Sequence, residues 1–153
     1  MIINWYSTNI DVNHLSQRLR TAYALWVVES SPGNLLSLKQ IQSSTHYEEL
    51  LPYIAVVENQ GDVKLPKFVF LTAGSKVIEL FGTELAAQNI DDVFTEAGRS
   101  LVEEVFDELR SERKPVLCSV SGSPIISEDI EVIVMPLWND NAAKELALAV
   151  YDF

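Results

Sequence analysis

Residues 130–137 and 145–151, near the C-terminus, have the composition of β-strands with apolar side chains on both faces. In the first of these segments Val132 and Val134 would point to one face, and Ile133 would point to the other. A strand with one face in water alternates apolar and polar residues instead. A sheet that contains these strands therefore needs an apolar cover on each side, so it must lie between two other layers.

Two amphipathic helices are available to cover this sheet. Apolar residues recur at three- and four-residue steps in residues 11–29 and 96–112, which is the helical period. Asp11 is the expected N-cap of the first helix. The helix at 96–112 is expected to cover one face of the sheet, and the N-terminal helix or a partner subunit the other. The two apolar stripes are Leu15, Leu19, Ala22, Tyr23, Trp26 and Val27, and Ala97, Leu101, Val102, Val105, Phe106 and Leu109.

Shorter elements are predicted from local start and stop signals. A helix that Thr45 and Glu48 would open as a capping box is expected to end near Leu51. Ser75 is the expected cap of another short helix, which Gly82 would end. Strands are predicted at 53–58, 67–73 and 116–121, short helical segments at 76–81 and 90–94, and turns at 30–33 and 139–141. Together these elements predict an α+β fold.

Size and charge limit the function. The chain has 153 residues, which is about one domain, and a net charge of −11 from 22 acidic and 11 basic residues. This balance argues against nucleic acid and an anionic membrane surface as partners, because both are bound through Lys and Arg. Cys118 is the single cysteine, and no secretory signal or membrane-spanning run is visible. We therefore expect a cytoplasmic domain without membrane insertion.

The first strand–helix crossover carries a recognisable pattern. The run from Phe68 to Ser75, FVFLTAGS, is followed by the run from Ile78 to Leu85, IELFGTEL. This pattern of a strand, a small turn, a helix, Phe-Gly and Glu-Leu resembles that of PAS domains. The order of the predicted elements along the chain is also that of a PAS domain.

More narrowly, the chain is similar to a bacterial family of short single-domain PAS proteins, often labelled PAS_5. Tyr23 and Trp26 match the Tyr-x-x-Trp helix of that family, and the run LLP at 50–52 matches its Leu-Leu-Pro segment. The run MPL at 135–137 and the turn NDN at 139–141 also resemble the family pattern. Residues 36–42 depart from it, because the usual proline, arginine and acidic residues are missing there.

The resemblance implies a PAS fold with a five-stranded antiparallel sheet and helices on one face. The N-terminal amphipathic helix would cover the other face or form a dimer interface. Residues 1–52 would be a helical extension packed on a PAS core at 53–153. The resemblance also implies a sensor or interaction module.

No residue pattern predicts a cofactor, a metal or catalysis. A covalent flavin sensor would need a cysteine between Gly82 and Phe94, where there is none, and Cys118 lies on a predicted strand. His14 and His46 both precede the first strand predicted from the sequence, which disfavours haem, and no acids or cysteines lie at metal-ligand spacing from them. No nucleophile motif is present, so the chain is not expected to be an enzyme.

Three groups of residues are candidate functional sites. Apolar side chains expected to point inward form a candidate pocket for a small, largely apolar ligand: Phe70, Phe81, Phe94, Phe106, Cys118, Val120 and Met135. The N-terminal stripe is a candidate dimer or partner contact: Leu15, Leu19, Tyr23 and Trp26. The outer face of the long helix is a candidate docking face for a basic partner: Glu103, Glu104 and Asp107. A homodimer and an unidentified protein partner are expected.

These observations predict a sensory or regulatory domain that acts by binding other proteins under the control of a small ligand. One alternative is a constitutive scaffold whose pocket is filled by its own side chains. The other is a cone-shaped α+β enzyme with a carboxylate base, which the two strands before the long helix disfavour.

Overall fold

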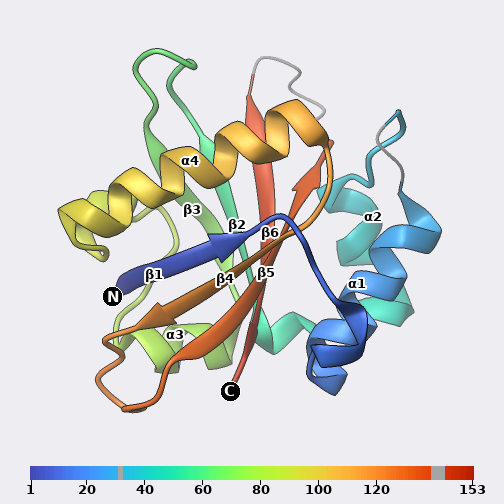
Figure 1. Ribbon diagram of the computed structural model, residues 1–153, viewed down its shortest axis with the longest axis horizontal. Helices are drawn as coiled ribbons and strands as arrows, with labels where there is room; N and C mark the ends of the chain where they lie inside the picture. The colour runs from blue at the N-terminus through green and yellow to red at the C-terminus, as the bar shows by residue number, and fades with distance from the viewer. Residues whose placement is uncertain (31–32, 139–143) are drawn as a thin grey trace.

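The computed structural model of the chain describes residues 1–30, 33–138 and 144–153. At its centre lies one antiparallel sheet of six strands in the order β1-β4-β5-β6-β2-β3 (Figure 1). The strands are β1 (Ile2–Ser7), β2 (Ile54–Asn59), β3 (Phe68–Ala73), β4 (Val116–Ser121), β5 (Ile130–Leu137) and β6 (Glu145–Asp152). The predicted α+β antiparallel fold is confirmed, with six strands in place of five.

Helices lie on both faces of this sheet. The long helix α4 crosses one face, and α1 and α2 lie on the other side (Figure 1). The helices are α1 (Gln17–Glu29), α2 (Leu38–Ser43), α3 (Ser75–Phe81) and α4 (Glu96–Glu112), with single 3₁₀ turns η1 (Val12–His14), η2 (Thr45–Tyr47), η3 (Leu51–Tyr53) and η4 (Ile90–Asp92).

The alternation of β5 and β6 divides the apolar interior into two cores. Val132 and Ala149 belong to the core under α4, whereas Ile133 and Val150 belong to the core under α1. Successive side chains of a strand point to opposite faces, so each strand supplies both cores. The enclosed sheet predicted from these two strands is therefore confirmed.

Helix α4 has the boundaries predicted from its apolar stripe. The Thr95 hydroxyl caps its start by accepting a hydrogen bond from the Gly98 N–H at 3.2 Å. Val102, Val105, Phe106 and Leu109 are buried against the sheet. The helix ends at Arg113, whose N–H donates to the Leu109 carbonyl at 3.0 Å.

Strand β1 was not predicted. It forms one edge of the sheet and pairs only with β4, and its register shifts between Ile3 and Trp5. Such a bulge breaks the two-residue alternation that identifies a strand. Only Ile3 is buried among its six residues, so the segment lacks the apolar pattern of a core strand.

Three predicted helix starts are wrong. Asp11 caps the turn η1, and α1 begins later with Ser16 as its N-cap. The capping box lies at Ser37, where α2 starts, and not at Thr45. Gly74 precedes α3, and no side chain caps that helix, so Ser75 has no capping role. Ser, Thr and Asp side chains cap whichever turn the main chain forms, so the residue type alone does not place the helix start.

The predicted turns at Pro32 and at residues 139–141 lie outside the described residues. The division into an extension at 1–52 and a core at 53–153 stays a prediction, although β1 belongs to the central sheet. None of the helices in the described segments is long and apolar enough to cross a bilayer.

Candidate functional site

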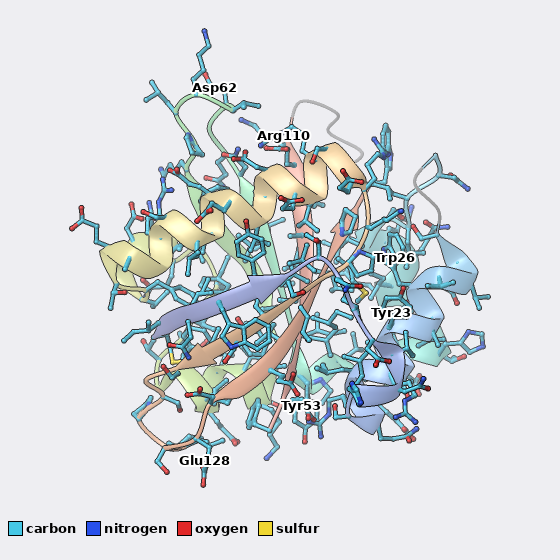
Figure 2. All side chains as sticks on the ribbon, viewed as in Figure 1. Tyr23, Trp26, Tyr53, Asp62, Arg110 and Glu128 are labelled. Atoms are coloured by element: carbon cyan, nitrogen blue, oxygen red, sulfur yellow. The ribbon has the colours of Figure 1, made fainter. Side chains whose placement is uncertain are left out.

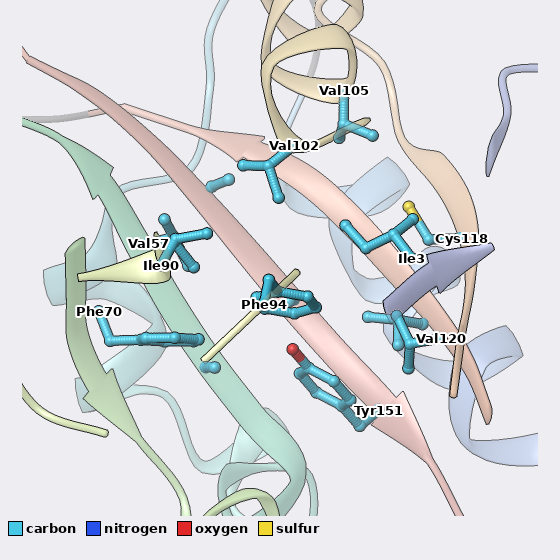
Figure 3. Close-up of a cluster of buried hydrophobic side chains, with 14 of the residues drawn as sticks. Ile3, Val57, Phe70, Ile90, Phe94, Val102, Val105, Cys118, Val120 and Tyr151 are labelled. Atoms are coloured by element: carbon cyan, nitrogen blue, oxygen red, sulfur yellow. The ribbon is translucent and has the colours of Figure 1, made fainter. Parts of the chain in front are cut away.

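A small apolar cavity lies between α4 and the sheet (Figure 3). Its volume is about 60 Å³. All six strands of the sheet contribute to its wall, together with the turn η4 and the helix α4. Its aromatic and sulfur-containing members are Phe70, Phe94, Phe106, Cys118 and Tyr151, and the other members are aliphatic.

The cavity exists because β6 presents small side chains to α4. Ala147 and Ala149 line it from β6, opposite Val102 and Val105 of the helix. The intervening residues of β6 are larger, but they point into the other core. Alanine leaves space that valine or leucine would fill, so the alternation of β6 determines where this space lies.

Tyr151 supplies the polar group of this cavity. Its hydroxyl points from β6 toward Phe94 (Figure 3), and no hydrogen-bond partner for it is found among the described residues. Burial raises the pKa of the Tyr151 hydroxyl, and the nearby Cys118 raises it further. The group therefore stays neutral and is available for one hydrogen bond to a bound molecule.

Cys118 is expected to be unreactive in the folded protein. The side chain is buried, and burial raises the pKa of its thiol from about 9 to about 12. The reactive thiolate is therefore rare at pH 8, roughly one molecule in ten thousand. Ellman's reagent should modify the thiol at pH 8 only after the protein is unfolded in guanidinium chloride. Rapid modification of the native protein would contradict this and would show that the cavity opens to solvent.

The same shift makes stability depend on pH. The folded state favours the neutral thiol, so this contribution is fully present below about pH 9 and decreases as pH rises to about 12.

The structure brings together five of the seven predicted pocket residues. Phe70, Phe94, Phe106, Cys118 and Val120 line the cavity. Phe81 is buried in the same core and lies edge to face with Phe94 and Tyr151, at centroid distances of 5.7 and 5.9 Å, but it does not line the cavity. Whether any of them binds a ligand stays a prediction.

Met135 is wrongly placed by the sequence prediction. Its side chain is fully buried in the core under α1, on the opposite face of the sheet from the cavity. Val132 and Val134 of the same strand line the cavity. Met135 lies three positions after Val132, and this odd offset turns its side chain to the other face of the sheet.

Other lining residues were missed for two reasons. Ile3 lies on the unpredicted strand β1, which leaves no sequence signal for it. Tyr151 and the alanines of β6 had a signal, namely the alternation of small and large apolar residues in 146–151. The remaining members are Val57, Ile90, Val102, Val105, Val132 and Val134.

The N-terminal stripe packs on the sheet of its own chain. Leu15, Leu19 and Trp26 are buried in the core under α1, and Tyr23 is partly buried against it (Figure 2). The Trp26 indole N–H donates a hydrogen bond to the Pro136 carbonyl on β5 at 3.1 Å. The sequence left open whether the N-terminal helix covers the sheet of its own chain or forms a dimer interface. In the structure it covers its own sheet, so these residues do not form a free contact surface.

The acidic residues of α4 are exposed, as predicted, but two of them have basic neighbours. Glu103 pairs with Arg99 one turn earlier on α4. Asp107 accepts a hydrogen bond from the Arg110 guanidinium at 2.7 Å. Glu104 makes no ion pair within the described part of the chain. The net negative charge of this face is therefore smaller than the sequence suggests.

The two histidines lie away from the cavity. His14 is paired with Asp11 at 2.9 Å, and His46 with Glu29 at 3.3 Å. Within the described residues no cluster of three or more His, Cys, Asp or Glu side chains could hold a metal ion. The expected absence of haem and of covalent flavin stays a prediction.

Comparison with known proteins identifies the fold. A family model described as PAS domain (PAS_5) matches residues 17–151, which is most of the chain. The chain belongs to the PAS domain family. PAS domains are typically signal-sensing modules, and they often mediate protein interactions or dimerise.

Solved PAS-type structures resemble this PAS domain at low identity. The PAS domain of BvgS from Bordetella pertussis is 13% identical, with a TM-score of 0.46 over 64% of this chain and 73% of that chain. A fungal LOV domain photoreceptor is 16% identical, with a TM-score of 0.43 over 65% of this chain and 74% of that chain. No curated protein matches the chain.

Proposed function

We propose that this PAS domain is a sensory regulator that binds a small, largely apolar molecule in the cavity under α4 and acts by contact with other proteins. The observation that supports it most is the apolar cavity under α4, in which the Tyr151 hydroxyl is the one hydroxyl group among the lining residues. Ligand sites in proteins are mostly apolar, with few polar groups that orient the ligand. The cavity wall contains no carboxylate or imidazole, which argues against catalysis there.

The size of the cavity limits the ligand. A volume of about 60 Å³ compares with about 150 Å³ for an engineered apolar cavity that binds benzene. The ligand therefore has only a few non-hydrogen atoms, and it accepts or donates one hydrogen bond at Tyr151. A larger ligand would require α4 to move away from the sheet.

The same small volume favours a second function, that of a constitutive scaffold. A well-packed core contains few voids larger than a water molecule, and some natural cavities remain empty. In that case the domain would present a fixed surface to its partner, and nothing would bind under α4.

Native mass spectrometry of the purified protein separates these two functions. The sensor is expected to carry a small molecule that is lost in the Ala149→Ile variant, because the isoleucine side chain occupies the cavity. Circular dichroism checks that the variant is folded.

The matched control is Ala24→Ile, which adds the same atoms on the exposed face of α1 and should keep the molecule. A wild-type spectrum with only the bare chain would support the scaffold. Retention of the molecule by Ala149→Ile would exclude the cavity as its site.

The output surface is proposed to be the exposed outer face of α4. Of the three predicted docking residues on it, Glu104 has no basic partner among the described residues, although the Tyr6 hydroxyl forms a hydrogen bond with it. A pull-down from the native host compares the wild type with a charge reversal of Glu103, Glu104 and Asp107. The expected homodimer, the bacterial source and the cytoplasmic location stay predictions.

A further inference from the structure

A second cavity lies at the C-terminal end of α4, where this helix passes over β5 and β6. Its volume is about 210 Å³, larger than that of the cavity under the middle of the helix. The last turns of α4, the facing ends of β5 and β6, and Leu35 from the loop before α2 enclose it. Arg110, which is labelled in Figure 2, is one of its lining residues.

One side of this cavity is apolar. Phe106, Leu109 and Leu146, all largely buried, form its inner wall. Trp138 lies at its rim and is 47% exposed. The main chain of Trp138 is fixed, because its N–H donates to the Leu36 carbonyl at 2.8 Å. An exposed indole beside an apolar wall is a surface on which a planar ring can stack.

The other side is basic, although the protein as a whole is strongly acidic. The Arg110 charge is compensated, because its guanidinium donates to Glu145 at 2.6 and 2.9 Å and to Asp107 at 2.7 Å. The Lys144 ammonium donates to the main-chain carbonyl of Gln60 at 2.7 Å and has no carboxylate partner within the described residues. Its positive charge is therefore available to an anion in the cavity.

Arg113 is the basic residue of the cavity wall whose side chain has no hydrogen-bond partner among the described residues. Its Nε atom is buried and makes no hydrogen bond, and none of the described acids pairs with its guanidinium. A buried donor left without an acceptor destabilises the fold. Arg113 also lines the cavity, so an acceptor bound there would meet a guanidinium that has no carboxylate partner.

The main chain of Arg113 also favours another residue type. It is left-handed, with φ 53° and ψ 41°, at the position that ends α4. Glycine is the usual residue there, because a side chain in this conformation is strained. An arginine at this position keeps the strain and brings a guanidinium to the cavity wall.

We propose that this cavity binds a small aromatic carboxylate. The carboxylate accepts hydrogen bonds from the guanidinium of Arg113, with Lys144 adding a second positive charge. The ring lies against Trp138 and the apolar wall that Phe106 and Leu109 form. This site shares Phe106 with the cavity under the middle of α4, but it does not depend on the function proposed for that cavity.

The surroundings of the cavity favour a ligand group with one negative charge over a group with two. The C-terminal carbonyls of α4 lie at this end of the helix and carry partial negative charge. Of the two arginines in the wall, Arg110 is already bonded to Glu145, which also lies in the wall. Arg113 therefore offers the one guanidinium among the lining residues that is free of a carboxylate. A carboxylate matches this arrangement better than a phosphate dianion.

Titration of the full chain with benzoate tests the proposal, using ¹H–¹⁵N spectra that resolve the Arg113 Nε–H and the Trp138 indole N–H. Both signals are expected to shift and to saturate with a Kd of about 1 mM or below. Benzamide, which has the same shape without the charge, is expected to bind much more weakly. The proposal is overturned by an absence of shifts with millimolar benzoate, by equal binding of benzamide, or by tighter binding of phenyl phosphate.

The Arg113→Gly variant separates ligand binding from folding. Glycine relieves the left-handed main chain, so the melting temperature should stay the same or rise. Benzoate binding, followed at Trp138, should weaken by about tenfold or more. The matched control is Lys114→Gln, which removes the same charge at an exposed neighbour outside the cavity and should change the Kd by less than about twofold. Wild-type affinity in Arg113→Gly, or an equal loss in both variants, would refute the site.

Discussion

The Trp26→Asp variant is expected to be unfolded at room temperature. Trp26 is 4% exposed in the core under α1, and its indole N–H is bonded to the Pro136 carbonyl at 3.1 Å. Truncation of a buried Trp or Phe costs about 3–5 kcal/mol, and a buried unpaired carboxylate adds to this. The sum is comparable to the total stability of a small domain, about 5–15 kcal/mol. Circular dichroism and the denaturant midpoint measure the loss.

The matched control is Val28→Asp on the same helix, where the side chain is 83% exposed. It introduces the same charge without burying it, so stability should change by less than about 0.5 kcal/mol. A Trp26→Asp protein that stays folded and elutes as the wild type in light scattering would contradict the packing of α1 on its own sheet. Loss of folding that depends on protein concentration would instead indicate a dimer contact.

The Gly74→Ala variant is expected to lose about 3 kcal/mol of stability or more, at the upper end of the cost of overpacking. Gly74 joins β3 to α3, and its N–H donates to the Ile54 carbonyl at 2.7 Å. A methyl group there would lie 2.5 Å from the carbonyl carbon of Pro52 and closer still to the carbonyl oxygen of Leu51. These are main-chain atoms within the turn η3, so they cannot move aside as a flexible side chain does. Urea unfolding measures the difference.

The control for this variant is Gly33→Ala. Apart from its chain neighbours, no atom of the described residues lies within 4 Å of a methyl group built at Gly33, and the φ of Gly33 is not left-handed. Alanine there should leave stability unchanged or raise it by up to about 1 kcal/mol, through the entropy of the unfolded chain. Equal effects of the two substitutions would mean that the close approach at Gly74 does not exist.

The predicted elements that proved right are those whose signal is local and strong. The helix at 96–112 and the strands at 116–121 and 130–137 have the predicted boundaries. Their apolar residues repeat with one period over the whole element, and a breaker such as Pro115 follows the helix. The C-terminal glycine of α3, Gly82, is also confirmed, since its φ of 74° is one that glycine adopts without strain.

The features that the sequence did not reveal depend on contacts between distant residues. Strand β1 is a strand because β4 offers it a free edge, and its own sequence shows no alternation. Five of the seven predicted cavity residues were found, because large apolar residues on the right elements converge under α4. Met135 was misplaced because the face of a strand follows from its register with its neighbours. Residue type alone does not show that register.

The sequence by itself determined the layers of this PAS domain. Strands that are apolar on both faces must be enclosed, and two amphipathic helices are present to enclose them. Only the tertiary structure decided that α1 packs on its own sheet, that the alanines of β6 leave a cavity opposite α4, and that Arg113 and Trp138 line one cavity at the end of that helix. The period of a strand or helix is a property of neighbouring residues, whereas a cavity depends on which side chains from distant segments fail to fill the space between them.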